Sequence, residues 1–352
     1  MDYQTLLNEL LTKLVKEDAS DLHLGVGRRP SMRINGDLII LVKDDVVDEK
    51  TMMGILGVIL DKDRLDRFVK NKEMDFSYTF AGVAHLRGNA FVQRGLVCLA
   101  LRLIPKAKSF AELNLPPILA SLAQKKQGFF LVVGPVGQGK STTLSTMINT
   151  INNERADHIV TIEDPIEFVY EPQKSIIDQR EVGVDTKDFV DALSATLRED
   201  VNVILIGEMR NPETIAAAVT AAETGHLVFS TLHTNNAAQT IDRIIDSFPP
   251  GQQDQIRLQL AGSLLGVFSQ RLIPRISGGR IPAYELLINN NAVANVIREK
   301  RTHEINTIIE TSSAEGMIDM NRSLVELVQK GDISIENAYQ YSFNPKGLER
   351  MI

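Results

Sequence analysis

The sequence predicts an α/β fold in which a smaller α+β domain precedes a larger domain with a parallel sheet. The chain has 352 residues, a length that favours two domains over one. From about residue 110 onward, short apolar runs alternate with helical patterns, which is typical of strands covered by helices on both faces. Before that point, helical and strand-like segments are mixed. The expected domains are therefore residues 1–103 and 111–352, joined by a linker at 104–110.

The first domain is expected to begin with a short helix and to continue as a mixed sheet. Apolar residues recur at helical spacing between positions 6 and 15 and give this helix one apolar face. Asn35-Gly36 tolerates the positive φ angles of a tight hairpin turn, so 31–34 and 38–42 are predicted strands. The other predicted elements are helical segments around 51–72 and strands at 75–80, 83–91 and 96–103.

The second domain is predicted to follow the linker, where Pro105 disfavours helix in the residue before it and two lysines favour solvent. After residue 250 the chain is expected to be mostly helical, with interruptions at 271–275 and 280–287 around a Ser277-Gly278-Gly279 turn. The buried parallel strands of this domain are expected at 129–133, 158–162, 202–206 and 227–231.

Composition excludes several classes of protein. A net charge of -7, with 6 Tyr, 13 Phe and no Trp, argues against a protein that coats or stacks on nucleic acid. The single cysteine, Cys98, cannot form an intrachain disulfide or a multi-cysteine zinc site. No run approaches 18 apolar residues, and the N-terminus lacks a basic start followed by an apolar core. We therefore expect a cytoplasmic protein.

The most specific motif is a phosphate-binding loop at residues 134–141. Its sequence GPVGQGKS matches G-x-x-x-x-G-K-[ST] and follows the predicted strand at 129–133. The glycines let several backbone N–H groups point inward, and the following helix adds the positive end of its dipole. ATP is the expected ligand. Its expected contacts are Gly134, Pro135, Val136, Gly137, Gln138, Gly139, Lys140, Ser141 and Thr142.

Two residues of this loop carry the expected chemistry. Lys140 would neutralise the β and γ phosphates, and the Ser141 hydroxyl would complete the coordination of Mg²⁺. Glu163 and Glu208 each follow an apolar run, so they are expected at the carboxyl edge of the sheet, beside the loop. Gly207 stands where an aspartate is usual before Glu208. Either carboxylate can orient water, Glu208 can also hold the metal, and each alone could be a solvated strand end.

Two of the six histidines lie close together in the sequence. His226 and His233 are seven residues apart and flank the predicted strand at 227–231, so they are expected at its opposite ends. That spacing suits neither a compact metal site nor a helical pair of metal ligands. A role in sensing phosphate is more plausible, although a histidine beside a strand is commonly a hydrogen-bonded structural residue.

These motifs together resemble the secretion ATPases of the type II and type IV pilus superfamily, and within it the PilT-type retraction ATPases. The resemblance rests on the phosphate loop, on the acidic segment 163–167, on the strand that ends at Glu208 and on the histidine segment 226–233. Further matching segments are ASDLHL at 19–24, QREV at 179–182, LRED at 197–200, IGEMR at 206–210 and STLHT at 230–234.

The resemblance implies a homohexameric motor that powers pilus retraction, with a PAS-like N-terminal domain and a RecA-like ATPase domain in each subunit. It also implies that N-terminal arginines approach the phosphates, and the matching positions are Arg87, Arg94 and Arg102. Arginine suits this role because its planar guanidinium spreads positive charge and keeps its proton. Each of these arginines could instead be a solvated strand residue.

Residues 296–305, VIREKRTHEI, are similar to the AIREGKTHQI retraction motif of that family. Val296, Lys300 and Glu304 replace its alanine, glycine and glutamine. The runner-up function is a pilus assembly ATPase, but those relatives often carry a four-cysteine zinc element that this chain cannot build. Two further functions compatible with a P-loop are a nucleic-acid motor and an inactive scaffold. The intact loop and carboxylates disfavour the scaffold.

The resemblance further implies where the protein acts and what it contacts. It places the ring at the pilus base, peripherally associated with the inner membrane. The expected partners are an inner-membrane pilus platform protein (PilC-like) and other pilus ATPases, without nucleic acid and without zinc.

Overall fold

The computed structural model describes residues 2–34, 36–81, 84–104 and 107–352, which form two compact units. Unit 1 comprises Met1–Lys106 and Pro165–Val169, and unit 2 comprises Ala107–Asp164 and Tyr170–Ile352. Asn35 of the predicted hairpin turn, and Pro105 and Lys106 of the predicted linker, lie outside the described residues.

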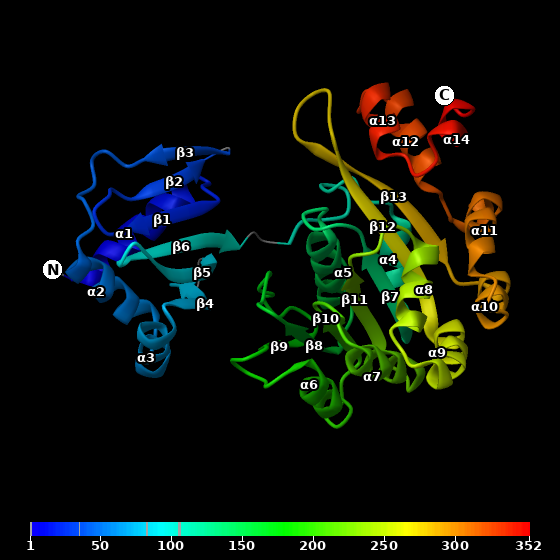
Figure 1. Ribbon diagram of the computed structural model, residues 1–352, viewed down its shortest axis with the longest axis horizontal. Coiled ribbons are helices and arrows are strands. Elements are labelled where there is room, and N and C mark those ends of the chain that lie inside the picture. The colour runs from blue at the N-terminus through cyan, green and yellow to red at the C-terminus, as the bar shows by residue number, and fades with distance from the viewer. Residues whose placement is uncertain (1, 35, 82–83, 105–106) are drawn as a thin grey trace. The chain divides into compact units, whose positions relative to one another are not determined.

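Unit 1 is an antiparallel sheet packed against three helices (Figure 1). The order in the described sheet is β3-β2-β1-β6-β5-β4, and every neighbouring pair is antiparallel. The helices begin after aspartates, because the side chains of Asp2, Asp48 and Asp61 accept from backbone N–H groups of each first turn. The elements are α1 (Tyr3–Lys16), β1 (Asp21–Gly25), β2 (Ser31–Ile34), β3 (Asp37–Ile40), α2 (Glu49–Ile59), α3 (Lys62–Asn71), β4 (Glu73–Phe80), β5 (Ala84–Gln93) and β6 (Leu96–Ile104).

The core of unit 1 lies between α1, α2 and one face of this sheet. Leu7, Leu10, Leu11 and Leu14 of α1 are fully or almost fully buried, as their helical spacing predicts. They pack with alternate residues of β1 and β6, since successive side chains of a strand point to opposite faces. Within the described residues, the predicted helices and strands of this region are present, and Val83 of the predicted strand at 83–91 lies outside them.

Unit 2 is built on a seven-stranded, mostly parallel sheet in the order β13-β12-β7-β11-β10-β8-β9. The strands β7 to β12 run parallel to their neighbours, and β13 pairs antiparallel with β12. The predicted parallel strands are confirmed, whereas β9 was missed because it is an edge strand in which four polar residues follow two isoleucines. The strands are β7 (Gly128–Val133), β8 (His158–Glu163), β9 (Ile176–Glu181), β10 (Val203–Ile206), β11 (Leu227–Leu232), β12 (Leu264–Pro274) and β13 (Arg280–Ile288).

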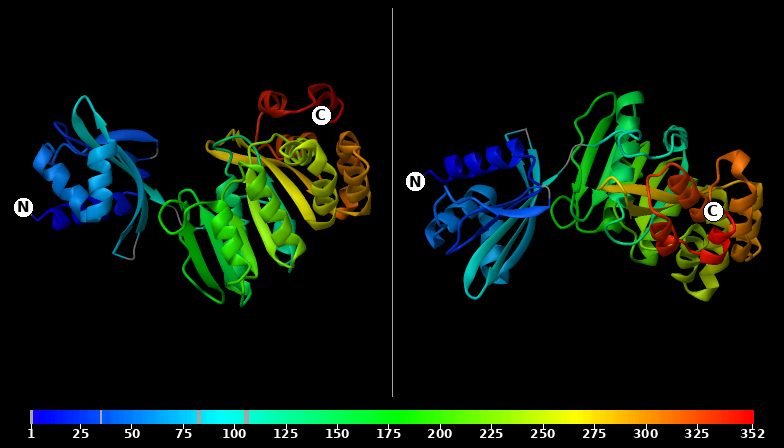
Figure 2. Two further views of the ribbon diagram at one scale, coloured as in Figure 1. Left: turned by 60° about the horizontal axis from the view of Figure 1, so that its bottom comes forward. Right: turned by 90° about the horizontal axis from the view of Figure 1, so that it is seen from above.

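Helices cover both faces of this sheet, as the apolar runs predict (Figure 2). On one side, α5 packs on β7 and β11 and also contacts α4. On the other side, α6 to α11 bury Phe129, Leu131 and Val133 of β7 in the main core. The helices of these two layers are α4 (Ile118–Ala123), α5 (Lys140–Glu154), α6 (Phe189–Thr196), α7 (Pro212–Glu223), α8 (Ala237–Asp246), α9 (Pro250–Ser263), α10 (Asn291–Arg298) and α11 (Ile305–Thr311).

The C-terminal part of unit 2 gathers at the turn end of the β12–β13 hairpin (Figure 1). Ile273 and Ile281 of the hairpin pack there with apolar residues of the last helices. One expectation is corrected: residues 264–270 belong to β12 and are not helical, because their backbone pairs with β7 on one side and with β13 on the other. The remaining elements are η1 (Thr302–Glu304), η2 (Ser313–Glu315), α12 (Met320–Gln329), α13 (Ile335–Tyr341) and α14 (Pro345–Glu349).

The fold class is confirmed: a P-loop α/β domain follows a smaller α+β domain. Among the described residues, no helix is both long enough and apolar enough to cross a membrane.

Candidate active site

The phosphate-binding loop connects β7 to α5 at the carboxyl edge of the sheet. Gly134, Gly137 and Gly139 all have positive φ angles, of 146°, 76° and 80°. At Gly134 a side chain is also excluded sterically, because a Cβ atom would lie 2.5 Å from the carbonyl oxygen of Gln270. The curled backbone that can surround a polyphosphate therefore requires glycine at these positions. The helix α5 begins at Lys140, within the last residues of the loop.

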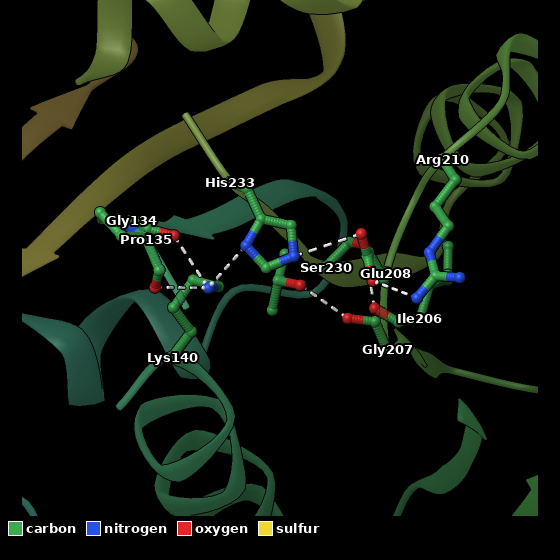
Figure 3. A network of polar contacts seen from close by, with 10 residues as sticks. Gly134, Pro135, Lys140, Ile206, Gly207, Glu208, Arg210, Ser230 and His233 are labelled. Carbon is green, nitrogen blue, oxygen red and sulfur yellow. Dashed lines mark hydrogen bonds and ion pairs between the residues drawn. The ribbon is translucent and has the colours of Figure 1, made fainter. Parts of the chain in front are cut away.

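Lys140 is buried at the centre of the site (Figure 3). Its Nζ donates to the carbonyl oxygens of Gly134 and Pro135, at 2.8 and 3.0 Å. The same Nζ lies 3.2 Å from Nδ1 of His233. The lysine charge is thus held within the loop, where the phosphates of a nucleotide would lie.

His233 bridges Lys140 and Glu208. Because an ammonium group can only donate, Nδ1 of His233 accepts from Lys140, and the neutral ring then carries its proton on Nε2. Nε2 lies 3.2 Å from Oε1 of Glu208 and donates to it. The sequence placed these three residues in separate motifs, and the structure joins them in one chain of contacts.

Glu208 follows β10 and is ionised at neutral pH. Partial burial raises the pKa of its carboxyl group, but the hydrogen bond and charge of Arg210, with the charge of Lys140, lower it below the ordinary value of 4.5. Arg210 Nη2 is 3.0 Å from Oε2 of Glu208. The carboxylate therefore stands charged beside the phosphate loop, able to accept a proton or to bind a cation.

Two hydroxyl groups on β11 fix the end of β10 and so position Glu208. Ser230 Oγ donates to the carbonyl oxygen of Ile206 at 2.9 Å, and Thr231 Oγ1 donates to that of Gly207 at 2.7 Å. Both side chains are buried. Sequence reasoning did not assign them a role, although polar residues inside an otherwise apolar strand were an available signal.

Glu163 ends β8, which lies one strand further from the phosphate loop than β10. Its Oε1 accepts from Thr161 Oγ1 at 2.7 Å, and Gln179 Nε2 of β9 is 3.5 Å away. At Gly207, on the neighbouring strand, a Cβ atom would lie 3.4 Å from the Cα of Glu163. A side chain in place of this glycine would therefore begin in van der Waals contact with the backbone of Glu163.

The strand β12 anchors the phosphate loop from the other side. Gln270 Nε2 donates to the carbonyl oxygen of Gln138 at 2.7 Å, and its Oε1 accepts from Thr143 Oγ1 at 2.6 Å. The side chain of Gln138 in turn accepts from the backbone N–H of Leu272 at 2.7 Å. This anchor was also missed, because residues 264–270 were expected to be helical.

A cavity of about 310 Å³ opens beside the start of α5. It touches the phosphate loop at Gly139 and the first turn of α5 at Thr142 and Thr143. Its other walls come from residues 108–115 and from the β12–β13 hairpin, including Lys108, Glu112, Asn114, Gln270 and Arg280. The cavity lies on the β12 side of β7, whereas Glu208 lies on the β11 and β10 side. Of its wall at 108–115, the predicted linker includes Lys108, and no residue of this wall was predicted to line the site.

The structure does not bring His226 to the phosphate loop. His226 precedes β11 and His233 follows it, as expected for opposite ends of one strand. Nδ1 of His226 is 3.0 Å from the carbonyl oxygen of Ala221, within the turn that ends α7. Within this chain, His226 therefore fits the structural role and not the predicted nucleotide contact.

The three predicted arginines lie in unit 1, on the hairpin of β5 and β6. Arg87 and Arg102 face each other across the two strands, whereas Arg94 lies in the turn between them with φ of 52°. Nε of Arg102 is 2.8 Å from Oδ1 of the nearly buried Asp21. Seven residues of extended strand separate Arg87 from Arg94, roughly 23 Å. The structure thus groups two of the arginines and separates the third.

The segment similar to the retraction motif forms the end of α10, a turn and η1. Lys300 adopts a positive φ of 62°, a conformation that favours the glycine found there in the motif. Its Nζ pairs with Asp254 of α9 at 2.6 Å. Thr302 Oγ1 donates to Asp242 of α8 at 2.7 Å. The segment is thereby attached to α8, which directly follows the segment that contains His233.

The sequence model of the type II/IV secretion system proteins matches residues 3–340. The chain belongs to this family. It is 44% identical over 341 residues to the type IV pilus retraction ATPase PilT of Pseudomonas aeruginosa, covering 97% of this chain and 99% of the relative. It is 45% identical over 321 residues to a twitching motility protein of Neisseria gonorrhoeae, covering 91% of this chain and 86% of the relative.

Among solved structures, this secretion-family chain is similar to the pilus retraction motor PilT crystallised with bound ADP. The TM-score is 0.91 at 45% identity, covering 97% of this chain and 98% of the other. The family resemblance drawn from the motifs is confirmed. Among the described residues, no three or more His, Cys, Asp or Glu side chains gather as metal ligands.

Proposed function

We propose that this chain is an ATP-hydrolysing motor that powers type IV pilus retraction. The observation that carries the proposal is 44% identity to a pilus retraction ATPase over 97% of the chain. The site supports it, because Lys140, His233 and Glu208 are joined at a loop built to hold phosphates. The reaction converts ATP and water into ADP, inorganic phosphate and a proton.

The side chains divide the chemistry among them. Lys140 and the inward N–H groups of the loop stabilise the charge that develops on the γ-phosphoryl oxygens. Glu208 orients the attacking water and accepts its proton, and Glu163 is the second candidate for this role. His233 contacts both Lys140 and Glu208. When the γ phosphate binds or leaves, His233 moves, and the distance between Lys140 and Glu208 changes with it.

The residues present also fit Mg²⁺. This ion prefers oxygen ligands and commonly takes only one or two from the protein, the rest coming from water and substrate phosphates. Ser141 at the start of α5 and the ionised Glu208 supply a hydroxyl and a carboxylate. Bound there, Mg²⁺ would neutralise phosphate charge. The ribose and base would occupy the cavity beside Gly139.

The N-terminal arginines are proposed to supply additional positive charge to the phosphates. Since Arg94 lies roughly 23 Å along the hairpin from Arg87 and Arg102, one phosphoryl group can be contacted by that pair or by Arg94, but not by all three. Each set would bring charge from unit 1, so that movement of this unit and hydrolysis become coupled.

Replacing the arginine set that contacts phosphate by alanine is expected to lower kcat by at least roughly tenfold, since an arginine finger stabilises transition-state charge. Steady-state ATPase assays on Arg94→Ala and on Arg87→Ala with Arg102→Ala would identify that set. Asp21→Asn is the matched control, because it breaks the Arg102 ion pair and keeps the arginine. Unchanged kcat in all arginine variants would remove this mechanism.

We further propose a homohexamer at the cytoplasmic face of the inner membrane. Its partners would be a PilC-like pilus platform protein and other pilus ATPases, with neither nucleic acid nor zinc involved. Light scattering of the purified protein with nucleotide should give six times the 39.0 kDa chain mass. A persistently monomeric protein would contradict the ring.

The function is tested by deleting the gene in its piliated host and imaging surface pili. We expect many pili and no twitching, because pili are assembled but not withdrawn. Expression of the wild-type chain should restore twitching, and expression of Lys140→Ala should not. Cells without pili would indicate an assembly ATPase instead.

A further inference from the structure

A second cavity, of about 410 Å³, lies on the far side of Glu208 and His233 from the phosphate loop. It is bounded by the ends of β10 and β11 and by α7 and α8. The loop residues do not line it, unlike the smaller cavity beside Gly139. Its polar lining is Glu208, Arg210, His233, Thr234, Arg243 and Ser247.

The wall between this cavity and the phosphate loop consists of reacting groups. His233 faces Lys140 through Nδ1 and Glu208 through Nε2 (Figure 3). His233 and Glu208 thus connect the lysine of the phosphate loop to the lining of this cavity. The cavity has room for a phosphate ion with several waters.

The cavity presents positive charge to an anion. Arg210 contributes one guanidinium, and its hydrogen bond to Glu208 raises its pKa, so it remains charged. Arg243 of α8 contributes another, and within the described residues its guanidinium has no carboxylate partner. The Glu208 carboxylate in the same lining would repel an anion, but its charge is offset by the ion pair with Arg210. Arg243 is thus the cation in this lining most available to a ligand.

We propose that this cavity binds the inorganic phosphate produced by hydrolysis, held by Arg243 and Arg210, before the phosphate leaves the protein. The inference rests on the proposed ATPase function. It adds a product site that is separate from the phosphate loop, so phosphate can bind while ADP occupies that loop. Guanidinium groups suit this ligand because they donate paired hydrogen bonds to phosphate oxygens.

The test is binding of inorganic phosphate to the ADP-loaded full chain, measured by isothermal titration calorimetry. ADP covers the α- and β-phosphate positions of the loop but leaves the γ position open, so the site of bound phosphate is assigned by its dependence on Arg243, which lines only the second cavity. We expect Arg243→Ala to weaken phosphate binding by roughly tenfold or more, the effect of losing a charge-assisted hydrogen bond. Arg243→Lys should retain part of the affinity, and ADP affinity should stay the same in both variants.

Arg322→Ala is the matched control, because Arg322 is an arginine of α12 outside the cavity. Equal phosphate affinity in Arg243→Ala and Arg322→Ala would overturn the proposal. Absence of phosphate binding to the ADP-loaded wild type would also overturn it, for example if a neighbouring copy fills the cavity. Normal ATP hydrolysis in either case would leave the proposed function standing, whereas a wild type without ATPase activity would refute that function itself.

Discussion

Lys140→Ala is expected to abolish most ATP hydrolysis, with a loss of roughly 10²- to 10³-fold or more in kcat. The side chain is buried and its ammonium group is held by two loop carbonyl groups and His233. No other residue of the loop is a cation, so the substitution removes charge that the transition state requires. Steady-state phosphate release with Mg-ATP measures the effect.

Lys126→Ala provides the control for this experiment, since it removes an exposed lysine just before β7. It should hydrolyse ATP like the wild type. Circular dichroism should establish that Lys140→Ala is folded, because the loop keeps its glycines and its bonds to β12. Near-normal turnover in a folded Lys140→Ala variant would contradict the proposed enzyme.

Glu208→Gln is expected to leave nucleotide binding intact and to lower hydrolysis by roughly 10²- to 10⁴-fold, the range for loss of a general base. Glutamine keeps the shape of the side chain, but its single carbonyl oxygen can accept from only one of Arg210 and His233, which donate to different oxygens of Glu208. What is lost is the negative charge that orients water and accepts its proton. Fluorescent-nucleotide binding and single-turnover hydrolysis separate the two effects.

Glu163→Gln is the matched comparison, because Glu163 lies at the same sheet edge one strand further from the phosphate loop. The variant with normal nucleotide affinity and the larger loss of hydrolysis identifies the carboxylate that orients water. If Glu208→Gln instead weakened binding while its hydrolysis step stayed normal, Glu208 would have a structural role and the assignment would be wrong.

The fold was predictable where a run of apolar residues corresponds to a strand that is buried on both faces. The strands β7, β8, β10 and β11 are short, mainly apolar runs because both their faces are covered by helices. The pattern failed at β9, an edge strand with polar residues, and at residues 264–270, whose burial is equally compatible with a core helix. In both cases pairing with distant strands decided the structure.

The site was predictable as a set of motifs but not as a geometry. A glycine loop, a lysine and two strand-end carboxylates are local features of the sequence. The contact of His233 with both Lys140 and Glu208 depends on β11 lying between β7 and β10. The cavities and the split between Arg94 and the other two arginines likewise depend on tertiary structure, which residue spacing does not encode.

The bonds from β12 to Gln138 and Thr143 have a consequence for the kinetics of nucleotide capture. They order the phosphate loop when the chain folds, so its backbone entropy is lost then and not when ligand arrives. A nucleotide meets a loop already shaped for it, and association need not wait for a local rearrangement there. Reordering of the loop is therefore not expected to limit the rate at which nucleotide is captured.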